Sequence, residues 1–251
     1  MTKAEIQLVR TLADKRGRTE SGLFVAEGEK LIGELRASQL HVRKIFSLEG
    51  VFEGPGIETV SPREMERLSL LKTANNSLAL VEIPRYNLRM ASLAGRLTLA
   101  LDEVQNPGNM GTVIRLADWF GISDVVCSEG SADCFNPKVV QATMGAILRV
   151  RVHYTDLAGF LAGAAPERLP VYGTFLEGEN IYGAQLAPAG IVVMGNEGRG
   201  ISDEAARSVT RKLFIPPYPA DRRGSESLNV AMATGIICSE FRRRTSLPPQ
   251  H

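Results

Sequence analysis

The sequence has no hydrophobic run that approaches the length of a membrane-spanning helix. It also lacks an apolar N-terminal segment of the kind that forms a signal peptide, because the basic stretch KRGR from Lys15 to Arg18 interrupts this region. Only three of the 251 residues are cysteine, and Cys127, Cys134 and Cys238 form no CxxC pair. We therefore expect a cytoplasmic protein with reduced thiols, no membrane association and no metal site.

Common nucleotide-binding and catalytic signatures are missing as well. No GxGxxG follows an early strand, which excludes the dinucleotide-binding fingerprint and the glycine-rich first loop of the commoner methyltransferase fold. No GxxxxGK[ST] occurs, so the chain is not a P-loop nucleotide hydrolase. The three histidines, His41, His153 and His251, are scattered along the chain, and we do not expect a histidine base.

Neither sign of charge dominates, because 29 Lys and Arg residues and 28 Asp and Glu residues leave a net charge of +1 at pH 7. Such a balance does not by itself indicate a nucleic-acid-binding protein. The two parts of the chain differ mildly: residues 1–97 hold 15 basic and 12 acidic residues (+3), and residues 98–251 hold 14 and 16 (−2). This asymmetry is compatible with RNA contacts made by the N-terminal part.

The N-terminal part of the chain predicts a small α/β unit of roughly eighty residues, an acceptable domain size. Helical spacing of apolar residues predicts a helix from Lys3 to Lys15, and the sequence RGR from Arg16 to Arg18 is expected to end it. A helix over residues 61–71 has Pro62 at its first position. The remaining elements expected here are a short helix around residues 31–35 and strands at 22–26, 42–48 and 77–83. The segment PRYNLR at 84–89 is the expected linker.

Beyond the linker, predicted strands and helices alternate. This alternation predicts an α/β fold with a mostly parallel sheet that helices cover on both faces. The pattern does not specify the order of the strands in the sheet. Strands are expected at residues 97–101, 124–127, 150–154, 171–175, 191–194 and 212–215, and helices at 110–120, 137–147, 157–164 and 228–241.

Two consecutive strands of this sheet end in loops of special composition. The strand Ile191–Met194 runs into GNEGRG, in which three glycines allow a sharp turn or a close approach of the backbone to a ligand, and Ser202 can then cap a helix. The next strand runs into PPYPADRRG, after which Ser225 or Ser227 opens the last helix. Open α/β sheets build binding sites at the carboxyl ends of such strands.

These loops also carry a family resemblance. NEGRG after a strand and SLNVAMATGII at the start of the last helix resemble the second and third motifs of the SpoU-type (TrmH-like) RNA ribose methyltransferases of the SPOUT superfamily. NPGNMGTVIR from Asn106 to Arg115 resembles the first motif, and the three occur in the expected order between Leu99 and Phe241. GLFVAEGEKLI, at residues 22–32, resembles the ribosomal-protein-like (L30e-type) domain that often precedes this catalytic domain.

The resemblance implies an architecture that periodicity alone does not. We expect an L30e-like RNA substrate-binding domain at residues 1–84, a linker at 85–97, a SPOUT methyltransferase domain at 98–244 and a tail at 245–251. In the family, the C-terminal segment is threaded through a loop to form a deep trefoil knot, although base rates favour unknotted chains. The resemblance also implies a homodimer formed through the knotted domain.

The implied activity is transfer of a methyl group from S-adenosylmethionine to a ribose 2′-hydroxyl of ribosomal or transfer RNA. In the family, backbone groups in the loops of the second and third motifs hold most of the cofactor. The positions that match cofactor-binding ones here are Met194, Gly195, Asn196, Gly198, Ile215, Pro216 and Leu228. The alternative function is that of a non-catalytic RNA-binding or ribosome-assembly protein that retains the fold. The presence of both Asn109 and Arg115 favours the enzyme.

The residues that match the family's catalytic and substrate-orienting set also have ordinary structural interpretations. The NPGN turn is typical of a helix N-cap, and Ser227 and Asn229 can cap the last helix. Glu197 can be an exposed loop acid. Arg115 can form a salt bridge with Asp118, Glu103 or Glu197. The implied catalytic set is Asn109, Arg115, Glu197, Ser227 and Asn229.

Because arginine stays protonated, we expect Arg115 to bind a phosphate and stabilise a developing alkoxide rather than to act as a base. Arg18, Arg222 and Arg223 are expected to contact RNA, the last two because they lie in the loop before the third motif. The run Arg242-Arg243-Arg244 is typical of a solvated helix face.

Overall fold

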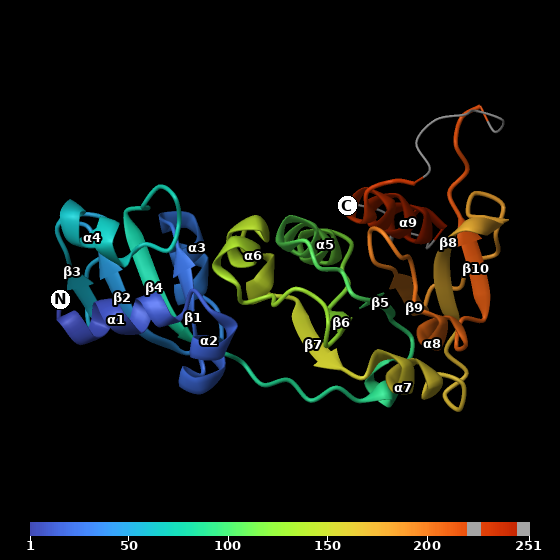
Figure 1. Ribbon diagram of the computed structural model, residues 1–251, viewed down its shortest axis with the longest axis horizontal. Helices are drawn as coiled ribbons and strands as arrows, with labels where there is room; N and C mark the ends of the chain where they lie inside the picture. The colour runs from blue at the N-terminus through green and yellow to red at the C-terminus, as the bar shows by residue number, and fades with distance from the viewer. Residues whose placement is uncertain (220–226, 245–251) are drawn as a thin grey trace, which may run out of the picture. The chain divides into compact units, whose positions relative to one another are not determined.

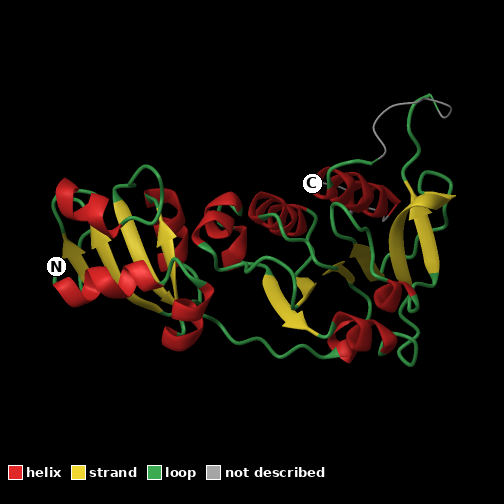
Figure 2. Cartoon of the chain, in the orientation of Figure 1, coloured by secondary structure: helices red, strands yellow, loops and turns green. Residues whose placement is uncertain are grey.

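The computed structural model describes residues 1–219 and 227–244, which form two compact units (Figure 1). Unit 1 consists of Met1–Arg85 and Asp133–Arg149, and unit 2 consists of Tyr86–Ala132 and the chain from Val150 onward. Within the described ranges, no helix is long and apolar enough to cross a membrane. Each unit combines helices and strands (Figure 2).

Unit 1 is built on a four-stranded sheet in the order β1-β4-β2-β3. Its strands are β1 (Leu23–Glu27), β2 (Val42–Ser47), β3 (Ile57–Thr59) and β4 (Ser77–Glu82). β4 is antiparallel to β1 and β2, and β3 is parallel to β2. The helices are α1 (Lys3–Thr11), α2 (Lys15–Ser21), α3 (Glu29–Arg36) and α4 (Pro62–Leu68). Leu12, Phe46 and Met65 are among the residues of the apolar core between α1, α4 and the sheet.

The predicted helix break at Arg16–Arg18 is wrong, because these residues lie inside α2. Gly17 serves close packing there rather than helix termination. A Cβ atom at this position would lie 2.0 Å from the carbonyl oxygen of Thr11 at the end of α1. Glycine therefore allows the two helices to approach each other, a role that composition alone does not distinguish from a break. The three-residue strand β3 was not expected from the sequence either.

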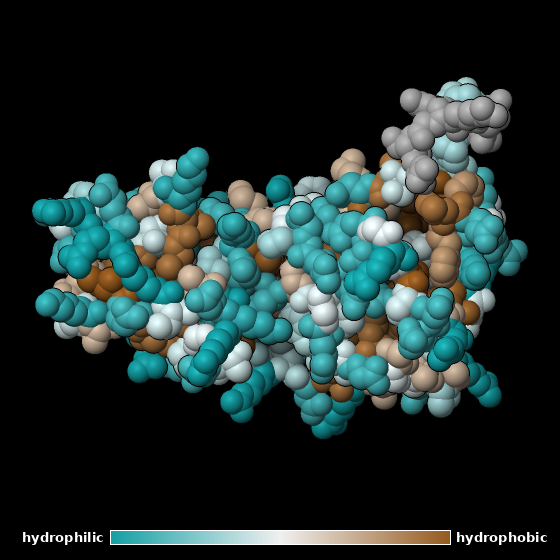
Figure 3. All heavy atoms as spheres, viewed as in Figure 1, coloured by the Kyte–Doolittle hydropathy of each residue, from teal (hydrophilic) through white to brown (hydrophobic). Residues whose placement is uncertain are grey.

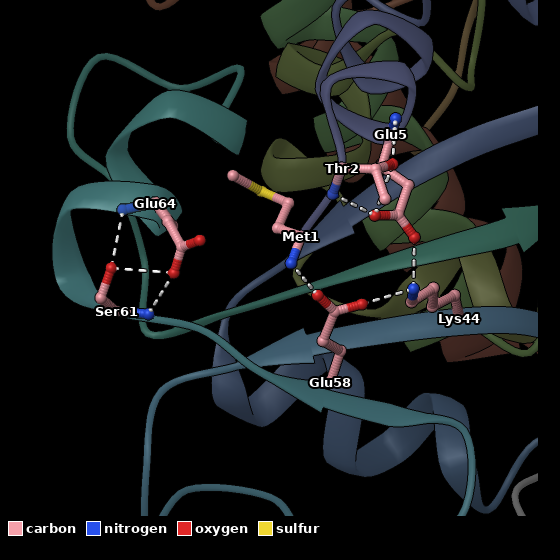
Figure 4. A network of polar contacts seen from close by, with 7 residues as sticks. All are labelled: Met1, Thr2, Glu5, Lys44, Glu58, Ser61 and Glu64. Atoms are coloured by element: carbon pink, nitrogen blue, oxygen red, sulfur yellow. Dashed lines mark hydrogen bonds and ion pairs between the residues drawn. The ribbon is translucent and has the colours of Figure 1, made fainter.

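Polar contacts tie the first residues of unit 1 to its sheet (Figure 4). Lys44 on β2 forms ion pairs with both Glu5 of α1 and Glu58 of β3. The N-terminal amine pairs with Glu58, and Thr2 and Glu5 form a capping box at the start of α1. Ser61 and Glu64 form a second capping box at α4, where Pro62 takes the predicted first position.

The segment 133–149 belongs to unit 1 although it lies in sequence between two strands of unit 2. Its helix α6 (Pro137–Ala142) packs against β1, and the ring centroid of Phe135 lies 4.8 Å from that of Phe24. The single helix predicted over 137–147 is wrong. Met144 and Gly145 have φ angles of 51° and 92°, which end α6 before the 3₁₀ turn η2 (Ala146–Leu148).

Unit 2 contains a six-stranded sheet in the order β10-β8-β9-β5-β6-β7, and every neighbouring pair is parallel. This confirms the predicted parallel sheet. Figure 1 shows α5 and α9 on one face of the sheet and α7 and α8 on the other. The strands are β5 (Leu97–Leu101), β6 (Asp124–Ser128), β7 (Arg151–Thr155), β8 (Val171–Asn180), β9 (Gly190–Met194) and β10 (Arg211–Phe214). The helices are η1 (Met90–Leu93), α5 (Pro107–Trp119), α7 (Leu157–Ala162), α8 (Asp203–Ala206) and α9 (Val230–Arg244).

The strand order places the loops of unit 2 where a site can form. From β5, the chain builds β6 and β7 outward on one side, and it then returns to add β8, β9 and β10 on the other side. β5 and β9 are therefore neighbours at the point where the winding direction changes. All residues of both strands are buried. In open α/β sheets, ligands bind in the crevice outside the carboxyl ends of the strands at this point.

The arginines at the end of α9 fix the helix in place. Arg242 donates to the carbonyl oxygens of Phe120 and Gly121, which follow α5. Arg244 donates to the carbonyl oxygens of Ile181 and Tyr182, at 3.0 and 2.6 Å. The prediction of a solvated face is therefore wrong for these two residues, because their guanidinium donors satisfy main-chain acceptors.

Candidate active site

Asn106 shapes the loop that follows β5. Its Oδ1 accepts hydrogen bonds from the backbone amides of Gly108 and Asn109, at 2.8 and 3.1 Å, so Asn106 is the N-cap of α5. Pro107 occupies the first helical position, where its missing N–H leaves no donor unsatisfied. This arrangement places Asn109 in the first turn of α5, at the carboxyl edge of the sheet.

The loop after β9 is a closed turn that glycine makes possible. Asn196 and Gly200 exchange two backbone hydrogen bonds of 2.9 Å. A Cβ atom on Gly195 would lie 2.3 Å from the backbone carbon of Gly200, so no larger residue fits there. The Asn196 Oδ1 accepts from the amides of Gly198 and Arg199, at 2.9 and 3.0 Å. Glu197 is thereby held at the exposed tip of this turn.

A chain of hydrogen bonds connects three segments that are distant in sequence. The Asn109 Nδ2 donates to Glu197 Oε1 at 2.8 Å, across a separation of 88 residues. The Asn229 Nδ2 donates to Asn109 Oδ1 at 3.0 Å, across 120 residues. The Asn229 Oδ1 accepts from the amides of Ala231 and Met232, so Asn229 also caps α9. The structure thus brings together three of the five predicted catalytic residues.

The other two predicted catalytic residues stand apart from this chain. Arg115 is exposed on α5 and forms no hydrogen bond or ion pair with any residue in the described ranges. Glu103, one of its expected salt-bridge partners, pairs with Arg199 instead, and Glu197 binds Asn109. Ser227 is exposed, and the capping role considered for it belongs to Asn229. Arg115 is therefore available to a ligand, with its charge not engaged by Glu103 or Glu197.

The predicted cofactor positions lie on three segments. Met194 ends β9 and is buried, Ile215 and Pro216 follow β10 and are half-buried, and Leu228 precedes α9 with 52% of its surface exposed. Gly195, Asn196 and Gly198 belong to the closed turn. The Asn196 side chain is engaged within the protein, because its Nδ2 donates to the carbonyl oxygen of Glu103 at 2.8 Å and its Oδ1 accepts two amide hydrogen bonds. Its backbone amide and carbonyl are paired with Gly200, so Asn196 mainly shapes the closed turn.

The RNA contact predicted for Arg18 is not supported. Its side chain is 2% exposed, and its Nε and Nη2 donate to Asp133 Oδ2 at 2.9 and 2.6 Å. Its Nη1 donates to the carbonyl oxygens of Leu12 and Ala13. The guanidinium therefore has a structural role in unit 1. Arg222, Arg223 and Ser225 lie outside the described residues.

Sequence reasoning missed Glu103 as a residue that supports the site. Glu103 has a φ angle of 54°, which is unfavourable for a residue with a side chain, and its backbone amide donates a hydrogen bond to Ser128 Oγ at 2.8 Å. Its carbonyl oxygen binds Asn196 and its carboxylate binds Arg199, so it fixes the closed turn from two sides. No local signal marks this role, because glutamate has no preference for left-handed backbone.

His153 lies on the same sheet but does not contribute to this edge. It is 7% exposed, and its Nε2 lies 2.9 Å from Asp124 Oδ1 at the beginning of β6. Burial of Asp124 opposes ionisation, but hydrogen bonds from His153 and Arg151 outweigh it and hold the pKa of Asp124 well below its usual range. The contacts of His153 within this buried cluster therefore support the fold of unit 2.

The fold and the site define a class of protein: a parallel α/β sheet with a polar ligand site at the carboxyl edge, attached to a second α/β unit. The family comparison makes this specific. The model of the SpoU rRNA Methylase family matches residues 96–239, and the chain belongs to this family. The model of the MRM3-like substrate binding domain matches residues 3–84.

Individual relatives resemble the chain over nearly its whole length. The 23S rRNA (guanosine(2553)-2′-O)-methyltransferase RlmP of Bacillus subtilis is 30% identical and covers 93% of this chain and 94% of its own. A Porphyromonas gingivalis protein assigned to the TrmH family of RNA methyltransferases is 38% identical, covers 98% and 99%, and superposes with a TM-score of 0.89. The AdoMet-bound rRNA methyltransferase of Sinorhizobium meliloti is 26% identical, covers 98% and 96%, and has a TM-score of 0.83.

Proposed function

We propose that this protein is an S-adenosylmethionine-dependent RNA (ribose-2′-O)-methyltransferase and that its substrate is large-subunit ribosomal RNA. The observation that carries the proposal is the hydrogen-bond chain from Glu197 through Asn109 to Asn229, which joins the three segments of family resemblance at one edge of the sheet. Membership of the SpoU rRNA Methylase family supports the reaction, and the likeness to RlmP over nearly the whole chain supports the substrate.

The residues around this edge fit a cofactor with an apolar ring and polar backbone contacts. Leu228, just before α9, and Met232, in the first turn of α9, are 52% and 64% exposed. Figure 3 shows hydrophobic residues gathered over α9, β8 and β10 on the face in view. Gly195 and Gly198 leave the backbone of the closed turn accessible. When bound, S-adenosylmethionine supplies an activated methyl group. Met194, Gly195, Asn196, Gly198, Ile215, Pro216 and Leu228 are proposed to hold it.

The protein's own residues then position the ribose and manage charge. Arg115 binds the phosphate next to the target ribose and stabilises the hydroxyl oxygen as it loses its proton, because a guanidinium stays charged and offers two parallel donors. Glu197 and Asn109 orient each other and fix α5 against the closed turn. Ser227 and Asn229 contact the ribose or its phosphate. Most of the rate enhancement comes from alignment of the hydroxyl with the methyl group.

The domain arrangement expected from the sequence remains part of this proposal. An L30e-like RNA substrate-binding domain at residues 1–84 is followed by the linker 85–97, the SPOUT domain 98–244 and the tail 245–251. The C-terminal segment of the SPOUT domain is proposed to be threaded through a loop to form a deep trefoil knot. Whole-chain similarity to the Porphyromonas gingivalis and Sinorhizobium meliloti structures supports this arrangement. A cytoplasmic location fits a protein that modifies ribosomal RNA.

A homodimer formed by unit 2 is also part of the proposal. α5 and α9 pack against each other, and each carries a large apolar side chain in solvent: Trp119 is 83% exposed on α5, and Met232 is 64% exposed on α9. Exposed apolar surface on adjacent helices is typical of a symmetric interface. Light scattering should give about twice the 27.3 kDa chain mass, and a stable monomer at micromolar concentration contradicts this part.

The function is tested by transfer of tritiated methyl groups from S-adenosylmethionine to purified 23S rRNA, with 16S rRNA and transfer RNA as controls. We expect incorporation into 23S rRNA and loss of one 2′-O-methyl position in cells that lack the gene. Binding of S-adenosylhomocysteine without transfer to any RNA would favour the non-catalytic alternative. Methyl transfer to 16S rRNA or transfer RNA alone would support the proposed reaction and contradict 23S rRNA as the substrate.

A further inference from the structure

Unit 1 contains a cleft on the side of its sheet where β2 begins. The cleft has a volume of about 280 Å³, close to the lower end of the roughly 300–1,000 Å³ typical of small-ligand sites. It lies between the end of α3, the start of β2 and the turn that leads into β3. Its apolar lining includes Leu35, Leu40, Val42, Ile45 and Ile57.

Main-chain hydrogen bonds hold the walls of this cleft. The amide of Ile45 donates to the carbonyl oxygen of Gly56 at 3.1 Å, which fixes the turn before β3 against β2. The amide of Glu82 donates to the carbonyl oxygen of His41 at 2.9 Å, which fixes the start of β2 against β4. The cleft is therefore formed before a ligand arrives, which lowers the entropic cost of binding.

Two exposed arginines lie at the rim. Arg36, the last residue of α3, and Arg43, on β2, both line the cleft, and neither forms an ion pair with a residue in the described part of the chain. The carboxylate of Glu82 contacts His41 at 2.9 Å and forms no ion pair with either arginine. Two arginines without an ion pair among the described residues therefore lie at the rim of a cleft with an apolar lining.

Phe52 positions one of these arginines. The guanidinium carbon of Arg36 lies 5.5 Å from the centroid of the Phe52 ring, within cation–π distance. The backbone amide of Phe52 is held by Ser47 Oγ at 3.0 Å. The Phe52 ring contacts one face of the Arg36 guanidinium. The opposite face can stack on a flat, electron-rich group, as arginine does with unstacked bases.

From these features we infer that the cleft binds one unstacked nucleotide of single-stranded RNA. The base stacks on Arg36 over the apolar floor, and Arg43 binds the adjacent phosphate. A base pair inside a duplex cannot enter, because its faces are covered by neighbouring pairs. This site rests on the proposed function for its ligand class, and it gives unit 1 a means of selecting a loop or bulge near the methylated ribose.

The test measures binding of fluorescein-labelled oligouridine and of a blunt RNA duplex of equal length to the full-length protein by fluorescence anisotropy. Arg36→Ala should weaken oligouridine binding on the order of tenfold, the loss expected for one stacked base. Arg43→Ala should reduce the slope of log K against log salt by about 0.7, the loss of one phosphate contact on a single strand. Arg67→Ala is the matched control, since Arg67 is exposed on α4 outside the cleft.

Two further measurements make the outcome decisive. Arg36→Lys should fail to restore oligouridine binding, because lysine keeps the charge but not the planar stacking surface. Duplex binding by the Arg36 variants should match that of the Arg67→Ala control. Equal losses for oligouridine and duplex would mean general electrostatic attraction and overturn the nucleotide site. Unchanged binding by Arg36→Ala and Arg43→Ala would overturn the nucleotide site as well, and would indicate a protein partner as the ligand of the cleft.

Failure of this site is distinguishable from failure of the proposed function. At saturating 23S rRNA, both cleft variants should transfer methyl groups at the unaltered maximal rate, with a raised KM for RNA only. Absence of methyl transfer by the unaltered protein would contradict the proposed function. The oligouridine measurement would still show whether the cleft binds a nucleotide. Thermal melting that matches the unaltered protein confirms that the exposed substitutions leave the fold intact.

Discussion

Two regions of this protein use charged side chains in different ways. Around helices α1 and α2 of unit 1, charges neutralise one another: Lys44 pairs with Glu5 and Glu58, and the buried Arg18 pairs with Asp133. At the carboxyl edge of unit 2, the connecting groups are two amides and one carboxylate, and Arg115, six residues after Asn109 on α5, is exposed without a pairing partner in the described residues.

This difference separates charges that stabilise the fold from a charge that is available for a ligand. A buried guanidinium is tolerable only when it is hydrogen-bonded, and Arg18 makes four such bonds, two to Asp133 and one each to the carbonyl oxygens of Leu12 and Ala13. An exposed arginine without a pairing partner costs little and can bind a phosphate. Arginine content alone therefore does not locate an RNA site; the pairing of each side chain does.

The largest effect is expected from Arg18→Ala, which leaves Asp133 without its partner in a poorly hydrated place. Breaking a buried ion pair destabilises proteins by about 3–5 kcal/mol, and urea denaturation of the full chain should show a loss of this size. Arg16→Ala is the matched control, because Arg16 is 87% exposed and pairs with Glu20 one turn away. Its cost should be under about 0.5 kcal/mol. Similar losses for both variants would contradict the buried role.

The next effect concerns Arg115→Lys, which keeps the charge and removes the planar pair of donors. Turnover should fall on the order of 100-fold, the loss typical of removing one preorganised donor from a developing oxyanion. Stability and S-adenosylmethionine affinity should stay nearly unchanged, because Arg115 is exposed and unpaired among the described residues. Arg207→Lys, also exposed in unit 2, is the control. The pH–rate profile adds a second criterion: rescue at high pH would indicate a base rather than a phosphate ligand.

A smaller effect is expected from Asn229→Asp. Aspartate retains the oxygen that caps α9, so the melting temperature should change little. Aspartate cannot donate to Asn109 Oδ1, so the hydrogen bond that connects position 229 to Asn109, and through it to Glu197, is lost. One lost hydrogen bond in a positioning network corresponds to about a tenfold fall in turnover. A large drop in melting temperature, or full activity, would show that the link between the three segments is unimportant for transfer.

Much of the sheet of unit 2 was predictable because its signals are local. Apolar runs specified the six strands, and Ser202 and Pro62 mark helix starts as predicted. The strand order was not predictable, since parallel strands with similar apolar sequences carry no local mark of their neighbours. Gly17 was misinterpreted for a related reason: close packing between helices and a chain break favour the same residue.

The candidate site was predictable only in part. The resemblance pointed to Asn109, Glu197 and Asn229, and the structure places them in one hydrogen-bond chain, whereas their catalytic role stays a prediction. Glu103 and the Arg18–Asp133 pair left no trace in the sequence. The first depends on an unusual backbone angle, and the second joins residues separated by 115 positions. Contacts of this kind are set by tertiary packing.

The smallest effect is a pH dependence of stability that unit 1 should show through Lys44. The hydrogen bond from Lys44, with others from Thr2, lowers the pKa of Glu5 to about 2, and Lys44 also lowers the pKa of Glu58. Because these folded-state pKa values lie below the ordinary glutamate pKa of 4.5, the stabilisation is present above about pH 4.5 and is lost as the pH falls toward 2. Lys44→Met should therefore reduce stability by under about 1 kcal/mol near neutral pH, as for a largely solvent-accessible pair, and by less in acid.

Urea denaturation at about pH 6 and about pH 3 measures both values. The control is Lys30→Met, on an exposed lysine of α3, which should leave the pH dependence unaltered. The Nζ of Lys44 lies 5.0 Å from the centroid of the Phe46 ring. An equal loss of stability at both pH values would mean that Lys44 stabilises unit 1 by packing against Phe46 rather than through Glu5 and Glu58.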